Sequence, residues 1–201
     1  MVEFAEYATI EREKSKHYGS DIDMPEHPHL KKLSDHLVES RHRLEEMAHR
    51  PKEQLKLKPH KNSWSALETA EHVRLTNELY LNVLPEVIES ADKSNPDEPF
   101  RPRIFGRLFI KLVSPDPTFK VKTVSAATPD SHSTDLDSLQ KLIGQQDDLL
   151  AVLAKADQVN LNRTKVKSPL NGLVKFTLGE ALSVMVLHQL RHLQQMDRAL
   201  G

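Results

Sequence analysis

The helix expected to begin at Thr177 and run nearly to the C-terminus constrains the fold most. Thr177 and Glu180 have the T-x-x-E spacing of a capping box, which predicts the helix start. Apolar residues occupy two opposite faces, one with Leu182, Val186, Leu190 and Leu193, the other with Ala181, Val184, Met185 and Met196. A helix that is apolar on both sides must be buried on both, either inside a bundle or against a second subunit. We expect a homodimer.

Two histidines interrupt the second of these faces. His188 and His192 are four residues apart, so on a helix their Cβ atoms lie about 5–6 Å from each other. Two imidazoles at this spacing can bind one metal ion through bonds of about 2.0–2.1 Å. A chain with 11 histidines in 201 residues can contain such a pair by chance. Burying two neutral imidazoles without partners costs roughly a few kcal/mol, which favours a metal site.

Two amphipathic helices are expected in the first half of the chain. The first begins at Pro28 and ends before Pro51, and its apolar residues recur at heptad-like spacing. The histidines that lie off this apolar seam are expected on the surface: His29, His36, His42 and His49. The second begins at the capping box of Ser65 and Glu68 and continues to Val87.

The second helix contributes a third histidine to the expected core. His72 falls on its inward seam. Together with His188 and His192 it makes three histidines that face the expected core, which is harder to attribute to chance than the H-x-x-x-H spacing alone. Trp64 precedes the helix cap and is expected to pack over the helix start without a chemical role. Pro85 is expected to kink the last turns.

A crossover with six prolines fills residues 91–132, a pattern that no long helix tolerates. Residues 103–113 within it predict a short amphipathic helix in a basic segment. This helix is either a solvated crossover that packs its apolar side on the bundle, or a lid that offers Arg103 or Arg107 to an anionic substrate. Residues 118–124 alternate as a strand would, but no partner strand is apparent.

The third bundle helix is expected to open with Thr134 and Asp137 and to end near Asp157. Four amphipathic segments joined in this way predict an all-α fold, a four-helix bundle with a long crossover between its second and third helices. We expect one bundle domain over residues 28–201, preceded by an N-terminal arm over residues 1–27. A loop is expected between the third and fourth helices.

Composition limits which classes of partner and which metal ligands we expect. Lys+Arg 28 against Asp+Glu 29 gives a formal net charge of -1, so we expect neither nucleic acid nor a membrane as partner, and any basic patch must be local. The absence of cysteine excludes disulfides and thiolate ligands, which leaves histidine and carboxylate as metal ligands. Without a signal-like N-terminus or a run of about 18 apolar residues, a cytoplasmic protein is expected.

Short motifs add a family resemblance. They are W-S-x-x-E-x-x-E-H from Trp64 to His72, a basic G-R-L at 106–108, and T-L-G-E at 177–180 followed by H-x-x-x-H and Gln195. Over about residues 28–200 the chain resembles the DinB/YfiT-like superfamily, which includes bacillithiol S-transferases and mycothiol-dependent isomerases. The resemblance implies a divalent metal held by one histidine of the second helix and two of the last. In this sequence these are His72, His188 and His192.

Three histidines without a fourth protein ligand describe an open site, where water or a small-molecule substrate can bind. Zinc is the first choice for three imidazoles, followed by nickel, with iron possible. One interpretation is a metal-dependent enzyme, either a hydrolase that uses metal-bound hydroxide or a transferase that activates a low-molecular-weight thiol. The other is a non-catalytic bundle in which the metal stabilises the fold or a partner interface. Access to the site from solvent would favour the enzyme.

Two further residues have alternative roles. Glu68 lies one turn before His72 and could act as a base or hold a metal ligand in place, although its capping box already accounts for it. Gln195 lies on the inward face of the last helix and is either a buried hydrogen-bonding residue or a substrate contact.

Overall fold

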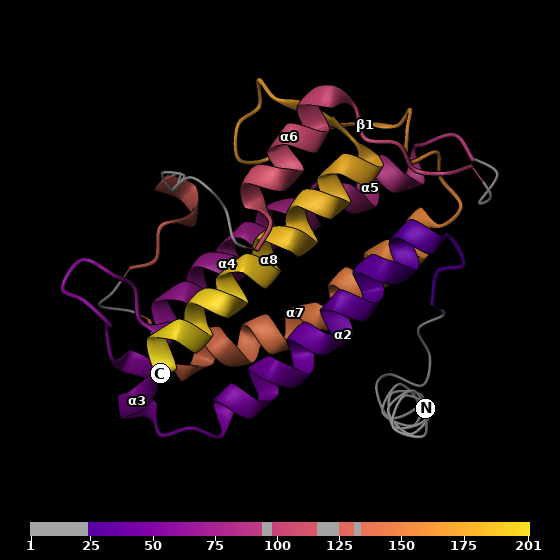
Figure 1. Cartoon of the computed structure of the whole chain (residues 1–201). Coiled ribbons are helices and arrows are strands. Elements are labelled where there is room, and N and C mark those ends of the chain that lie inside the picture. Colours follow the sequence, from indigo (N-terminus) through magenta and orange to yellow (C-terminus); the bar gives the residue numbers. More distant parts are fainter. Residues whose placement is uncertain (1–23, 94–97, 116–124, 131–133) are drawn as a thin grey trace, which may run out of the picture.

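Four long helices form the body of the protein (Figure 1). The computed structural model describes residues 24–93, 98–115, 125–130 and 134–201. The long helices are α2 (Pro28–Ala48), α4 (Ala66–Leu81), α7 (Leu136–Ala156) and α8 (Leu178–Leu200). Helix α7 packs against α2 and α4, and α8 packs against the same two helices, so each long helix touches two others. The prediction of an all-α four-helix bundle is confirmed.

Shorter elements join the long helices. They are α3 (Lys52–Lys56), α5 (Leu84–Glu89), α6 (Ile104–Val113), the 3-10 turn η1 (Ser125–Ala127), and the strands β1 (Lys165–Lys167) and β2 (Lys175–Thr177). The strands pair antiparallel as a small hairpin where we expected a loop. The strand-like segment 118–124 lies outside the described residues. None of the described helices combines the length and the apolar composition of a membrane span.

Local chemistry changes two of the predicted helix limits. The second helix does not kink at Pro85 but stops at Leu81, and Pro85 lies in the first turn of the separate helix α5, where its missing N–H costs nothing. The third helix is capped by Asp135, whose side chain accepts a hydrogen bond from the Leu136 N–H at 2.6 Å. Thr134 instead donates its hydroxyl to the carbonyl of Asp130, so the predicted Thr134 cap is wrong.

Both apolar faces of α8 are buried within a single chain. Leu182, Val186 and Leu193 are at most 1% exposed, and Leu190 is 7% exposed. The bundle itself therefore covers the face on which we based the homodimer. The expected dimer loses its structural argument, because that face is unavailable to a second subunit.

A layer of polar side chains divides the core. Two clusters of buried apolar residues fill the two ends of the bundle, one around Leu37, Tyr80 and Val186, the other around Leu44, Leu142 and Leu193. On each long helix a buried polar residue lies between them: Ser40, Asn77, Gln146 and Gln189. Asn77 donates to the Gln189 Oε1 at 2.9 Å, and Gln189 donates to the Gln146 Oε1 at 2.8 Å. Gln189 directly follows His188 in α8, so the layer crosses α8 next to its two histidines.

His29 is not the surface residue that we expected. Its Nε2 lies 2.8 Å from the Ser183 Oγ of α8, and its ring lies 4.3 Å from that of Phe100. Of the other three histidines off the apolar seam, His49 is exposed, and His36 and His42 are half-buried. His29 therefore packs the start of α2 against α8. Burial, followed by the charge of the nearby His27, lowers the pKa of His29 to about 4.

This depressed pKa predicts an acid-sensitive contact. Because the folded pKa lies below the ordinary value of 6.5, the unfolded chain binds the extra proton, so the stability from His29 is complete above pH 6.5 and falls toward pH 4. With chelator present, the free energy of unfolding should fall by about 1–2 kcal/mol from this group between pH 7 and pH 5. Denaturant titration should show a shallower pH dependence in His29→Gln than in the wild type. An unchanged slope would contradict the assignment.

One buried carboxylate anchors the crossover helix to the start of α8. Glu180 is fully buried, and it accepts hydrogen bonds from the Thr177 N–H at 2.8 Å and from the Arg103 N–H at 2.7 Å. The Arg103 guanidinium also binds this carboxylate, with Nη2 at 2.6 Å from Oε2. Burial would raise the pKa of Glu180, but the hydrogen bonds from Arg103 and Thr177 outweigh it and hold the pKa below its usual range. A Cβ on Gly106 would lie 2.2 Å from the Glu180 Cδ, so α6 needs glycine there to approach this carboxylate.

Candidate metal centre

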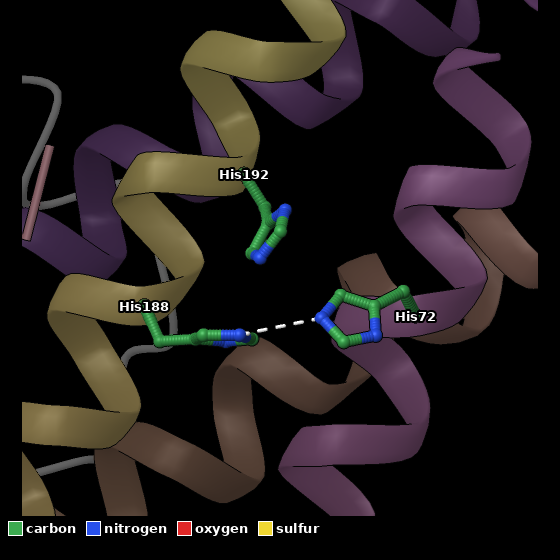
Figure 2. Close-up of side chains that lie close together, drawn as sticks. All are labelled: His72, His188 and His192. Atoms are coloured by element: carbon green, nitrogen blue, oxygen red, sulfur yellow. Dashed lines mark hydrogen bonds between the residues drawn. The ribbon is translucent and has the colours of Figure 1, made fainter. Parts of the chain in front are cut away.

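Three histidines from two helices converge inside the bundle (Figure 2). His72 comes from α4, His188 and His192 come one turn apart from α8, and their candidate ligand atoms all lie within 4.8 Å of one another. The His72 and His188 Nε2 atoms are 3.3 Å apart. Two ligands of a tetrahedral zinc at about 2.0–2.1 Å would be separated by about 3.3 Å. Small side-chain rotations can bring the remaining pair distances to the same value, so this cluster can hold a metal ion.

Hydrogen bonds to the far side of two rings fix which nitrogen faces the cluster. The His72 Nδ1 lies 2.6 Å from the Ala127 carbonyl oxygen of η1, and the His192 Nδ1 lies 2.9 Å from the Gln195 Oε1. Because a carbonyl oxygen only accepts, each Nδ1 must carry the proton, which leaves the Nε2 lone pair free to bind a metal. Of the three rings, that of His188 differs, because its Nδ1 is buried and has no hydrogen-bond partner among the described residues.

Burial keeps the three imidazoles neutral. His72 is 4% exposed and His192 is 8% exposed. Burial is the largest cause that lowers the pKa of His192 to about 3, and it also lowers the pKa of His72 and His188, the latter well below 6.5. Since metal binding requires neutral imidazole, the rings are in the binding form near pH 7 without losing a proton.

The structure brings to this site two further residues to which the sequence analysis assigned no role there. The Trp64 ring lies 4.9 Å from the His72 ring, so Trp64 packs against a candidate ligand as well as the helix start. Arg191 lies between the two histidines of α8, and its charge lowers the pKa of all three imidazoles. Its Nη1 donates to the Leu112 carbonyl of α6 at 3.0 Å. The i and i+3 positions of His188 and Arg191 could have suggested this placement.

The remaining candidate residues take different positions. Glu68 is 3% exposed, completes the capping box with Ser65, and lies 2.7 Å from the Nζ of Lys58. Gln195 bonds to His192, as described above. Arg103 binds Glu180 at the start of α8, about 12 Å along the helix from His188. Arg107 is exposed on α6. The structure therefore brings Gln195 to the histidines but binds Arg103 to a carboxylate elsewhere.

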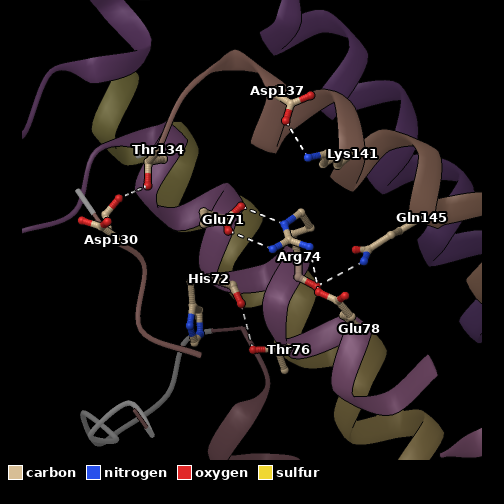
Figure 3. A network of polar contacts seen from close by, with 10 residues as sticks. All are labelled: Glu71, His72, Arg74, Thr76, Glu78, Asp130, Thr134, Asp137, Lys141 and Gln145. Atoms are coloured by element: carbon tan, nitrogen blue, oxygen red, sulfur yellow. Dashed lines mark hydrogen bonds and ion pairs between the residues drawn. The ribbon is translucent and has the colours of Figure 1, made fainter. Parts of the chain in front are cut away.

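A polar network on the outer side of α4 holds this helix in position (Figure 3). Arg74 forms ion pairs with Glu71 and Glu78 at 2.8 Å each. The backbone carbonyl of Arg74 accepts a hydrogen bond from the Gln145 amide of α7 at 3.2 Å. These bonds connect α4 to α7 two residues beyond His72, which supports the placement of the ligand from outside the core.

Comparison with known proteins agrees with this geometry. A search of curated proteins and a search of solved structures give no match to the chain. The family model of the DinB superfamily matches residues 36–196, which include all three histidines of the cluster and most of the bundle. The match covers far more than half of the sequence, and with the four-helix bundle and the three-histidine cluster it fits a metal-binding protein of this type. The chain belongs to the DinB superfamily.

Proposed function

We propose that this protein is a metal-dependent enzyme, either a hydrolase or a low-molecular-weight-thiol S-transferase, with His72, His188 and His192 as metal ligands. The observation that carries the proposal is the convergence of three imidazoles in a cluster to which no carboxylate among the described residues contributes. Three protein ligands leave a coordination position for water or substrate, as in catalytic zinc sites. When bound, a divalent ion here would lower the pKa of a water or thiol ligand.

The ligand set supports zinc as the first choice of metal, then nickel or iron. Three neutral imidazoles suit all three ions, and a tetrahedral arrangement favours zinc. They also leave the double positive charge of the ion uncompensated, so the site favours an anionic ligand such as a thiolate. Gln195 and the Ala127 carbonyl would orient the ligands, and Trp64 would limit the rotation of His72.

The second candidate is a non-catalytic bundle that the metal stabilises. The specific observation in its favour is the burial of His72 and His192, which come from two different helices. An ion bound between α4 and α8 would contribute to folding whether or not it performs chemistry. Glu68 does not decide between the candidates, because its capping box and its pairing with Lys58 already account for its burial.

Arg191 is our candidate for the residue that binds an anionic group of the substrate. Arg191 lies three residues after His188 on α8, and its charge lowers the pKa of that imidazole, whereas Arg103 is bound to Glu180. Among the described residues Arg191 has no carboxylate partner, since its one hydrogen bond goes to the Leu112 carbonyl. A guanidinium can bind a carboxylate through two parallel hydrogen bonds. A small thiol that also carries a carboxylate would therefore contact both the ion and Arg191.

Cobalt-loaded protein tests the thiol reaction and the anion contact together. Mercaptoacetate should give a sulfur-to-cobalt charge-transfer band at a concentration about tenfold lower than the neutral thiol mercaptoethanol. Arg191→Gln should remove this preference and leave mercaptoethanol binding unchanged. Arg107→Gln is the matched control. Titration of the band intensity gives both dissociation constants, and transfer of the thiol to an electrophile would identify the transferase.

Other outcomes of this titration separate the proposals. If Arg107→Gln removes the preference and Arg191→Gln does not, the anion contact belongs to the crossover helix. If no thiol perturbs the cobalt spectrum but esters, amides or epoxides are hydrolysed, the hydrolase replaces the transferase. If neither thiol binding nor hydrolysis occurs, the non-catalytic bundle becomes the better account.

A further inference from the structure

The outer side of α6 exposes apolar side chains to solvent. Ile104 is 88% exposed, Leu108 is 68% exposed and Phe105 is 51% exposed. One of our two interpretations packed the apolar side of this helix on the bundle, and only part of it does so, since Gly106 and Val113 are its buried residues. Ile104, Arg107, Leu108 and Lys111 are spaced at i, i+3, i+4 and i+7, which places them on one helix face. This outward face alternates apolar and cationic residues.

Positive charge is concentrated around this helix. Residues 99–113 and 164–179 contain no Asp or Glu, although the whole chain is nearly balanced with 28 Lys+Arg and 29 Asp+Glu. Apart from Arg103, the exposed cations of these two segments are Arg101, Arg107, Lys111, Lys165, Lys167 and Lys175. The strand alternation places the three lysines on one side of the hairpin, with Lys167 directly opposite Lys175. Like charges in such a pair repel, so an anionic partner would relieve a real cost.

Helix and hairpin lie together at one end of the molecule (Figure 1). Phe109 of α6 packs on Phe176 of β2 with ring centres 5.1 Å apart, and the Arg103 Nη2 donates to the Lys175 carbonyl at 2.8 Å. The cations of both elements therefore contribute to one local positive field, which at physiological ionic strength acts over about 8 Å.

We propose that α6 is a membrane-docking helix, which inserts Ile104, Phe105 and Leu108 into the interface of a bilayer that carries anionic phospholipids. An interfacial helix needs exposed apolar side chains on one face and Lys or Arg beside them, and α6 has both. The chain thus lies on the membrane surface and does not span it. The balanced charge of the whole sequence conceals this local surface.

A bilayer fits this surface better than a second copy of the chain does. A two-fold contact through α6 would bring Arg107, Lys111 and the hairpin lysines of one chain close to the same cations of the other, with no acidic residue in either segment to pair with them. Anionic headgroups supply the missing negative charge, and acyl chains accept apolar side chains without requiring a shaped groove. Each Lys or Arg at such a surface adds about fivefold to the partition coefficient.

Co-sedimentation with vesicles tests the proposal on the full chain. The protein should bind vesicles of phosphatidylcholine with about one third phosphatidylglycerol and should not bind pure phosphatidylcholine, and added salt should weaken the binding. The double variant Ile104→Ser with Leu108→Ser should lower the partition coefficient at least tenfold, because both side chains would insert. Leu57→Ser is the matched control, since Leu57 is 63% exposed on a different part of the surface.

A second pair of variants tests the charge. Arg107→Gln with Lys111→Gln should also reduce binding at least tenfold, whereas Lys31→Gln with Lys32→Gln, two exposed cations of α2, should have no effect. Thermal unfolding should match the wild type in all four variants, because the altered side chains are exposed. The proposal would be overturned if the protein does not bind anionic vesicles, or if it binds polyglutamate but not vesicles. It would also be overturned if the variant Ile104→Ser with Leu108→Ser binds vesicles fully, or if the wild type is a dimer that this double variant dissociates.

Discussion

Purified without chelator and without an affinity tag of histidines, the protein is expected to hold about one divalent ion per chain, and His72→Ala, His188→Ala and His192→Ala should each lose most of it. The physical reason is that each variant leaves two imidazoles from the cluster, too few to hold the ion. Elemental analysis of the purified variants measures the loss. His49→Ala, which removes an exposed histidine, should keep the wild-type metal content.

A variant next to the ligands should weaken metal binding without abolishing it. Gln195→Leu should retain the ligands but lower the metal affinity about 10–100-fold, because it removes the acceptor that orients His192. Chelator should lower the melting temperature of the wild type at pH 7.5. Acid should release the metal only well below pH 6.5, because burial lowers the pKa of all three imidazoles, that of His192 to about 3. Full metal content in all three histidine variants would rule out the site, and a melting temperature that chelator does not change would rule out its coupling to folding.

Glu180→Ala is expected to destabilise the protein by about 3–4 kcal/mol, the largest loss of stability that we predict for a single substitution. It leaves the Thr177 and Arg103 N–H groups without their acceptor and removes the partner of the Arg103 guanidinium. Denaturant titration measures the change. Glu68→Ala is the matched control, because Glu68 occupies the equivalent capping-box position of α4 and pairs with Lys58, and it should cost about 1–2 kcal/mol.

A double-mutant cycle isolates the packing at this carboxylate. Alanine normally stabilises a helix relative to glycine by about 1 kcal/mol, but a Cβ at position 106 would lie 2.2 Å from the Glu180 Cδ. Gly106→Ala should therefore destabilise the wild type and become neutral or stabilising in the Glu180→Ala background. If Gly106→Ala stabilises both backgrounds equally, α6 does not approach Glu180 as closely as described.

The parts of the fold that the sequence predicts are those governed by local rules. The capping boxes of Ser65 and Thr177 lie at the predicted helix starts, because they need only two residues three positions apart. The inward histidines follow from helical periodicity in the same way, since His72, His188 and His192 all lie on seams of apolar residues. Thr134 illustrates the limit: the neighbouring Asp135 competed for the same cap and took it.

What the sequence does not predict depends on contacts between distant segments. The Ala127 carbonyl that binds His72 belongs to a turn 55 residues away, and any residue supplies a carbonyl. Arg103 has the composition of an anion-binding residue, but its partner is a carboxylate 77 residues later in the chain. The burial of both faces of α8 could be explained equally by a bundle or by a dimer until the positions of α2, α4 and α7 were known.

The polar layer across the bundle limits how far the stability of the protein can be raised without disturbing its histidines. Leucine at Gln146 and Gln189 would join the two apolar clusters, and replacing buried polar groups with well-packed apolar ones often raises stability. Continuous leucine, however, packs almost equally well when one helix slides past another by a turn of about 5.4 Å. Such a slip would separate His72 from His188. The hydrogen bonds between the side-chain amides of Asn77, Gln189 and Gln146 can form in one alignment only. A redesign with leucine at these positions would therefore gain stability and lose the fixed geometry of its histidines.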